Sequence, residues 1–310
     1  MTRRILATAF LLAAVLALTA CGSDDATSVG PSPTATDTTE TTDSGDGEPT
    51  GTETTPTETT PAEPVSFQVW FAAPDLDERL NGGGDPKLFP VRRSAETLAV
   101  GRAALEDLIA GPTAADGERV SSAVPAQTRL LGLNIEDGLA TVDLSSEFES
   151  GGGSLSMQMR LAQVVFTLTQ FPTVDRVEFR LDGEPVDVFS GEGIVLDEPV
   201  DRGDYEDLMP AILVDQPVPG ARISSPLTVS GSANVFEANV TVRVLDASGK
   251  ELTRTFTTAT CGTGCRGDFS VAVTFPAQTA GSEGFVVVED DDAAGMGFPP
   301  HQVRIPVVFG

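Results

Sequence analysis

The sequence predicts an α+β domain with two helices on a mixed sheet, followed by an all-β sandwich and preceded by a disordered linker. Three observations support this fold class. Residues 24–64 contain almost no branched apolar side chains, residues 65–196 switch between strand and helix periodicity, and residues 210–310 keep the period of strands. Because only the last two parts offer apolar faces to bury, folding is expected only there.

The first 20 residues have the pattern of a cleaved export signal. Arg3 and Arg4 precede an apolar run, Ile5 to Ala17, that is too short to span a bilayer as a permanent helix. The tetrad that ends at Cys21, Leu-Thr-Ala-Cys, resembles the bacterial lipobox. The resemblance implies a signal peptide at 1–20, acylation of Cys21 with chains such as palmitate, and a lipid anchor at the extracytoplasmic face of the cell membrane. A transmembrane anchor and an ordinary secreted protein are the alternatives.

The charge and the cysteine count fit an exported protein. The formal net charge is −27 at pH 7, and such acidity opposes binding to nucleic acid or to anionic lipid headgroups. If Cys21 carries lipid, Cys261 and Cys265 remain. In an oxidising compartment these two are expected to form a disulfide, because no third or fourth soft ligand is at hand for a metal.

Residues 21–64 are predicted to be a disordered linker. From Asp24 to Pro64 the chain consists mainly of Thr, Pro, Glu, Asp, Ser and Gly, without Lys or Arg. Such a segment cannot bury enough surface to offset the entropy of ordering. It is expected to be a stalk or a plain spacer, and repeats such as Thr54-Thr55-Pro56 leave O-glycosylation open.

The domain at 65–196 is predicted to run strand, strand, helix, strand, strand, helix, strand, strand. The first helix is expected to begin at an N-cap Ser94, with Glu96 in the first turn, and to end at Gly111-Pro112. Asp137-Gly138 predicts a tight hairpin turn. The expected segments are strands at Phe67–Phe71 and Leu88–Val91, a helix with Leu98, Leu105, Leu108 and Ile109 on one stripe, hairpin strands at Leu131–Ile135 and Ala140–Leu144, a flexible loop at Ser150–Ser154, a helix of about Leu155–Gln170 that is buried nearly all round, and strands at Val177–Leu181 and Val186–Phe189.

Several motifs in this domain, over about Ser66 to Gly191, resemble the GerMN domain. They consist of hydrophobic and turn residues, so they are specific to the fold and not to a reaction. Proteins with GerMN domains include spore-germination and sporulation lipoproteins, a related domain occurs in actinobacterial lipoproteins that modulate a sensor kinase, and GerMN resembles ring-building modules of secretion-like assemblies. The resemblance therefore implies contacts with proteins or the cell wall. The motifs are Ala104–Pro112, Val124-Pro125, Ala140–Ser145, Gln163–Gln170 and Asp182–Val186.

Residues 197–209 are expected to be an acidic linker, and residues 210–310 to form an immunoglobulin-like sandwich. Six or seven short strands in about a hundred residues are typical of that fold. Three segments, Ile223–Gly231, Val235–Val240 and Arg266–Phe269, resemble the immunoglobulin-like domain of bacterial spore-germination proteins, the Gmad type. The expected strands are Leu227–Ser230, Val240–Leu245, Leu252–Thr258, Phe269–Phe275, Phe285–Val288 and Val303–Val308.

Residues that carry chemistry are scarce. His301 is the only histidine, and it is expected to be structural because no nucleophile motif lies nearby. No metal or cofactor site is predicted; the run Glu289–Asp292 offers hard oxygens for calcium but lacks the spacing of a known calcium loop, so a solvated turn is preferred.

Asp143 and Glu147 are the candidate carboxylate pair for glycan hydrolysis. The tripeptide Arg266-Gly267-Asp268 fits the start of a strand better than a recognition signal.

Together these observations predict a lipid-anchored envelope protein that binds and does not catalyse. The expected partners are the membrane, through the lipid, and an envelope protein or the cell wall; the oligomeric state stays open. A peptidoglycan hydrolase that uses Asp143 and Glu147 and a modulator of a membrane sensor kinase are the alternatives. Strand addition or ring-like packing is expected at two edge strands, Phe67–Phe71 and Val186–Phe189.

Overall fold

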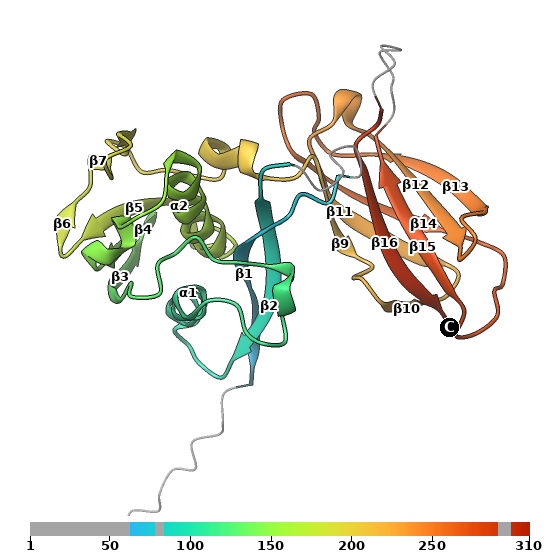
Figure 1. Cartoon of the computed structure of the whole chain (residues 1–310), viewed down its shortest axis with the longest axis horizontal. Helices are drawn as coiled ribbons and strands as arrows, with labels where there is room; N and C mark the ends of the chain where they lie inside the picture. Colours follow the sequence, from blue (N-terminus) through green and yellow to red (C-terminus); the bar gives the residue numbers. More distant parts are fainter. Residues whose placement is uncertain (1–62, 78–83, 291–298) are drawn as a thin grey trace, which may run out of the picture. The chain divides into compact units, whose positions relative to one another are not determined.

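The computed structural model describes residues 63–77, 84–290 and 299–310. Cys21, the predicted signal peptide, nearly all of the predicted linker and the last two residues of the acidic run lie outside these ranges. Residues Thr59–Gly310 form one compact unit. It contains two hydrophobic cores, which belong to an α+β domain and to an all-β domain (Figure 1).

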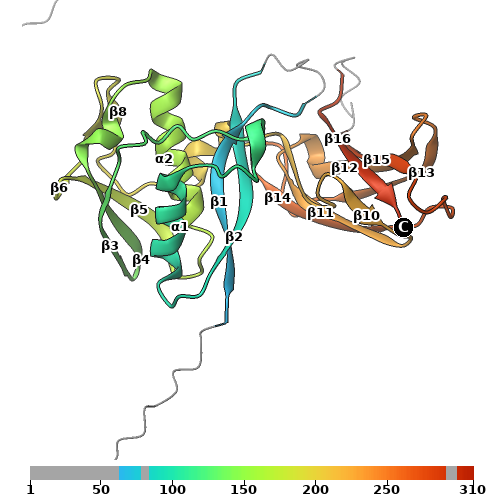
Figure 2. The same cartoon turned by 60° about the horizontal axis from the view of Figure 1, so that its bottom comes forward.

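In the first domain two helices lie between two sheets (Figure 2). The helices α1 and α2 pack against each other and against β1 on one side, and against β3 and β5 on the other. Strands β1 and β2 pair antiparallel as a separate two-stranded sheet, whereas the order β3-β4-β5-β6 forms a mixed sheet with β4 and β5 parallel. The α+β class is confirmed. The elements are β1 (Val65–Ala73), β2 (Lys87–Ala95), α1 (Val100–Ala110), β3 (Leu130–Glu136), β4 (Gly138–Leu144), α2 (Ser154–Leu168), β5 (Val174–Leu181) and β6 (Glu184–Pro185).

The position of α2 between two sheets explains why its sequence is apolar on all sides. Eleven of its 15 residues are buried, as predicted. Three of these are polar, Arg160, Gln163 and Thr167, and buried polar groups must find partners inside the protein. Arg160 bonds to the carbonyl of Gly151, so the loop before α2, expected to be flexible, is tied to the helix.

The predicted start of α1 is wrong. Ser94 lies in β2, opposite Ser66, and the N-cap position is held by Ala99. The reason is tertiary: β2 pairs with β1 over nine residues on each strand and continues to Ala95. Leu98, expected on the buried stripe, is therefore outside the helix and 96% exposed. The predicted end is confirmed, since Gly111 adopts a φ of +83°.

The hairpin between β3 and β4 forms as predicted. Asp137 and Gly138 have φ values of +49° and +82°, which suits a two-residue turn that matches the strand twist. The returning strand buries Ala140, Val142 and Leu144. The register between the strands shifts at a bulge between Leu130 and Gly132.

The predicted last strand, Val186–Phe189, does not form as one piece. The two-residue β6 pairs with β5, and Val186 N makes one further bond, to Phe179 O at 3.1 Å, before the chain leaves the sheet. Residues Val188–Phe189 (β7) pair instead with Ile194–Val195 (β8). The segment 197–209, expected to be a linker, contains the 3-10 turn η4 (Gly203–Leu208) and buries apolar side chains in the first core, namely Tyr205, Leu208 and Met209.

The second domain is a sandwich of two sheets, as predicted. One sheet has the order β10-β16-β15-β12-β13 and the other the order β14-β11-β9. The alternation along these strands sends valines into the space between the sheets, where Val229, Val242 and Val286 are fully buried. Two short strands, β9 and β10, were not expected. The strands are β9 (Ile212–Gln216), β10 (Ala221–Ile223), β11 (Leu227–Ala233), β12 (Asn239–Asp246), β13 (Glu251–Thr258), β14 (Gly267–Val273), β15 (Glu283–Glu289) and β16 (Gln302–Phe309).

Candidate functional site

The side of β1 that faces away from β2 is bonded to side chains of α2 and to Gln170, which follows the end of the helix. Gln170 accepts a hydrogen bond from Gln68 N at 2.7 Å and donates to Gln68 O at 2.6 Å. Thr167 Oγ1 accepts from Trp70 N at 3.1 Å. The helix thus supplies the bonds that a neighbouring strand would make.

Two further contacts complete this edge. Gln163 donates from Nε2 to Trp70 O at 3.0 Å and accepts from Ala123 N at 2.9 Å. Ala72 exchanges backbone bonds with Ser121. The hypothesis that β1 accepts a strand is therefore wrong, because its backbone groups are already paired. A sequence signal exists: within a strongly apolar stretch, the spacing of residues 163, 167 and 170 places three polar side chains on one helical face.

A polar cleft of about 470 Å³ lies where the ends of β1 and β2 meet η4 and the start of β16. His301 Nδ1 lies 2.8 Å from Oδ2 of Asp77, whose side chain is buried. Arg266 Nε donates to Glu206 Oε1 at 2.9 Å; burial acts to lower the pKa of Arg266, and the charge of Glu206 opposes this. Lys87 also lines the cleft. The charged side chains that line the cleft suit the polar groups of a binding partner.

The side chain of Arg266 is bonded to groups of the protein and is not presented at the surface for a partner. Its guanidinium also bonds to the carbonyl of Pro210 and the hydroxyl of Ser232. The tripeptide Arg266-Gly267-Asp268 therefore has a structural role at the start of β14, as the sequence indicated.

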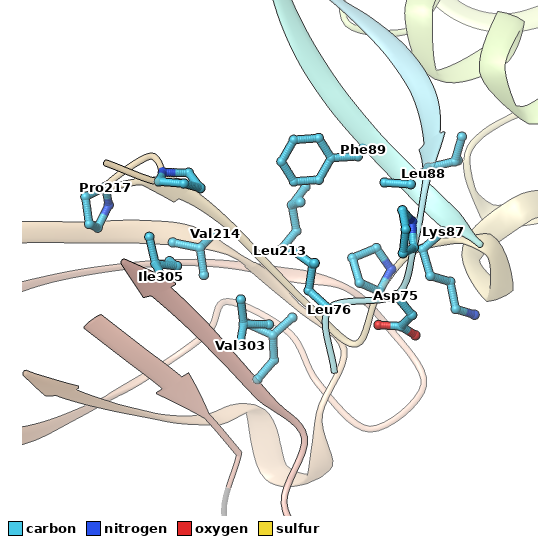
Figure 3. Close-up of a pocket in the computed structure, with 15 residues that line it drawn as sticks. Asp75, Leu76, Lys87, Leu88, Phe89, Leu213, Val214, Pro217, Val303 and Ile305 are labelled. Carbon is cyan, nitrogen blue, oxygen red and sulfur yellow. The ribbon is translucent and has the colours of Figure 1, made fainter. Parts of the chain in front are cut away.

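An apolar hollow of about 50 Å³ lies beside the polar cleft (Figure 3). Its wall includes Phe89 of β2 and Leu213 of β9, together with Val303 and Ile305 of β16. Leu76 at its rim is 53% exposed. A hollow of this size has room for one small apolar side chain, and together with the cleft it is the candidate recognition site.

Asp143 and Glu147 do not line this cleft or this hollow. Asp143 Oδ1 accepts a hydrogen bond from Gly183 N at 2.9 Å and so fixes the turn after β5. The hydrogen bond from the Ser145 hydroxyl lowers the pKa of Glu147. A glycosidase acid needs a raised pKa, so the lowered pKa does not favour Glu147 as the acid.

The acidic run after β15 is partly engaged within the protein. Glu289 forms an ion pair with Arg243 at 2.7 Å, and Asp290 Oδ1 accepts from His301 N at 2.6 Å. Within residues 63–77, 84–290 and 299–310, no group of three or more His, Cys, Asp or Glu side chains is placed to hold a metal ion. Cys261 and Cys265 lie before β14 with their Cα atoms 5.7 Å apart, a separation that a disulfide spans. Their oxidation stays a prediction.

Comparisons with known families identify both domains. Residues 56–187 match the Germane family, described as sporulation and spore germination. Residues 211–296 match Gmad2, the immunoglobulin-like domain of bacterial spore germination. The chain thus carries a Germane, or GerMN, domain followed by a Gmad2 domain, as its motifs predicted.

Three solved structures are similar to this chain. The first GerMN domain of the sporulation protein GerM from Bacillus subtilis is 24% identical with a TM-score of 0.34, over 43% of this chain and 98% of that one. The tandem GerMN domains of the same protein are 17% identical with a TM-score of 0.37, over 68% and 61%. A candidate lipoprotein from Clostridium perfringens is 22% identical with a TM-score of 0.32, over 47% and 93%. No curated protein matches. In the described part of the chain, no helix is long and apolar enough to cross a membrane.

Proposed function

We propose that this chain is a lipid-anchored protein of the cell envelope that acts by binding, in an envelope, sporulation or germination-related assembly. The anchor is Cys21, at the end of a lipobox-like tetrad. The two domain matches support an assembly of this kind. The folded domains face away from the cytoplasm and meet an envelope protein or the cell wall.

The main support for a binding role is that the candidate catalytic groups are committed to the fold. Asp143 bonds the backbone of a turn, and the pKa of Glu147 is lowered. In the polar cleft, Asp77 and Arg266 are paired with neighbouring side chains. Side chains paired in this way keep the cleft in one shape. A cleft of fixed shape beside an apolar hollow is suited to recognising another molecule.

The predicted linker between Cys21 and the first domain supports the same role. Tethering raises the effective concentration of a binding surface near any partner at the same membrane. A weak contact at the cleft is then sufficient for occupancy in the cell.

Crosslinking in living cells tests this proposal. A photoreactive residue at Leu76, at the rim of the hollow, is expected to give a discrete adduct with one envelope macromolecule, identified by mass spectrometry. Val195 is the matched control, because it is 62% exposed but lies on β8, away from the hollow. Equal yields and identical adducts at both positions would show that the hollow is not the contact.

A further inference from the structure

β3 is an edge strand that lacks the protection found on the other edges of its domain. The open side of β1 is bonded to α2, β2 carries Pro90, and β6 has two residues and ends in Pro185. By contrast, the seven residues of β3 include no Pro, Lys or Arg, and among the described strands it pairs with β4 alone. Proteins ordinarily blunt long edges with such residues, because an open edge pairs with another chain.

The backbone of β3 offers bonding groups at regular positions. In a two-residue hairpin the residues that flank the turn form a hydrogen-bonded pair, and paired and unpaired positions then alternate. Glu136 and Asn134 accordingly direct their N–H and C=O groups toward β4. Leu133 and Ile135 direct theirs away from β4, toward the open edge.

Apolar side chains accompany this edge on the side that faces α1. Leu133 and Ile135 pack against Gly101 of α1, where the missing side chain allows a close approach. Ile135 nevertheless remains 37% exposed. An added strand with aliphatic residues at alternate positions would cover it.

The charges at the two ends of β3 indicate which strand fits. Arg129 precedes β3, whereas Glu136 and Asp137 end it, and all three are exposed. A second copy of the strand, placed antiparallel and centred on Leu133, brings Arg129 of each copy opposite Asp137 of the other. Opposite charges across a strand pair are favourable, and the symmetry doubles the contribution.

We infer that two copies of this chain associate through antiparallel pairing of β3 with β3, which joins their mixed sheets into one. The contact is isologous, so it closes as a dimer. It is independent of the lipid anchor and of the binding role proposed above, because it uses only the β3 edge and the start of α1. A contact through one strand edge is small, so a dimer that dissociates on dilution is expected in solution.

The test uses the full chain in detergent micelles, studied by sedimentation and hydrogen exchange over a dilution series. A concentration-dependent dimer is expected, with amide protection of 130–136 that disappears on dilution. Ile135→Lys places a charge on the edge and is expected to raise the dissociation constant at least about tenfold. Phe256→Lys is the matched control, since Phe256 is 75% exposed on β13, an edge strand of the other domain.

A charge exchange identifies the register. Arg129→Asp sets like charges opposite each other and is expected to weaken the dimer by about tenfold. Adding Asp137→Arg to Arg129→Asp should restore much of the association, because position 137 lies opposite position 129 in this register. A chain that is monomeric at about 1 mM, a dimer whose 130–136 amides exchange at the monomer rate, or equal effects of Ile135→Lys and Phe256→Lys would each overturn the inference.

Discussion

Single buried polar residues fix the irregular segments of the GerMN domain. Arg160, on the buried helix α2, donates to the carbonyls of Ala123, Phe148 and Gly151, and so ties three loops to one side chain. Asp116 has a similar role near the end of β2, where it accepts hydrogen bonds from Arg93 and Thr113. These contacts explain how loops without regular structure keep one conformation.

Asp116→Asn should destabilise the GerMN domain in a pH-dependent way. Burial acts to raise the pKa of Asp116, but the hydrogen bonds from Arg93 and Thr113 and the charge of Arg93 outweigh it, so the pKa lies below its ordinary value of 3.8. The stabilisation is present above that value and is lost as the pH falls through the lowered pKa. At pH 7 the variant should lose about 1.5–3 kcal/mol in free energy of unfolding.

Fluorescence of Trp70, the only tryptophan, reports unfolding of this domain specifically. The exposed Glu96→Gln is the control and should change the free energy by less than about 0.5 kcal/mol. A gap between wild type and Asp116→Asn that is equally large at pH 7 and well below pH 3.8 would contradict the assignment.

The cysteine pair gives a second residue-level prediction. Exported, unreduced protein should take up no thiol label at Cys261 or Cys265, even after unfolding, and should take up label at both after reduction. The five-residue ring restricts the unfolded chain modestly, so replacing both cysteines with Ala should cost the Gmad2 domain about 2 kcal/mol. Two labelled thiols in unreduced protein would exclude the bond.

At the scale of elements, helix α2 takes the place of a missing strand. Gln163 and Thr167 of α2, together with Gln170 just after it, bond the open side of β1, so the two-stranded sheet needs no further neighbour. The same helix packs on β5. One element thereby joins the two sheets of the domain.

Gln163→Leu should destabilise the GerMN domain strongly. The change leaves Trp70 O and Ala123 N buried without partners, and each such group costs about 1–3 kcal/mol. A loss of about 2–5 kcal/mol is expected in chemical unfolding followed by Trp70 fluorescence. Gln127→Leu, at an exposed position, is the control. Equal stability of the two variants would mean that the α2 bonds do not hold β1.

Local turn chemistry was sufficient to predict several boundaries. Gly111 ends α1 and Asp137-Gly138 turns the hairpin because these positions need positive φ, which few residue types tolerate. The strands of the sandwich were also predictable, since their alternation reflects burial between two sheets. Such signals lie within a few residues of the feature that they determine.

Features set by distant pairing were not predictable in the same way. Ser94 looked like a helix cap, but the pairing of β2 with β1 draws it into a strand. The expected strand Val186–Phe189 is divided, because Val186 still bonds β5 whereas Val188 and Phe189 pair with Ile194 and Val195. The edge of β1 looked open, and its closure depends on contacts about a hundred residues apart. The candidate cleft likewise combines segments from both domains, which no local pattern reveals.

At the scale of the whole molecule, the segment 197–209 joins the two domains as a folded connection. Its apolar residues lie in the core of the GerMN domain, and Leu213 of β9 contributes to that core as well. The polar cleft and the apolar hollow form beside this connection. The recognition site that we propose thus depends on both domains being present.

The lipid anchor is testable on the whole chain. Cys21→Ala should release the protein into the medium or stall its processing, because the acceptor of the acyl chain is lost. Fractionation and immunoblotting give the distribution. The double replacement of Cys261 and Cys265 by Ala is the control and should stay with the membrane. A Cys21→Ala protein of mature length that still partitions with the membrane would contradict the anchor.

The most direct measurement of the central claim, binding without catalysis, is incubation of the purified full chain with peptidoglycan, followed by chromatography of the soluble fraction. No release of muropeptides is expected, and no difference between the wild type and a folded Glu147→Gln variant. Release of soluble muropeptides by the wild type, abolished by Glu147→Gln with the fold intact, would contradict the account and establish a hydrolase.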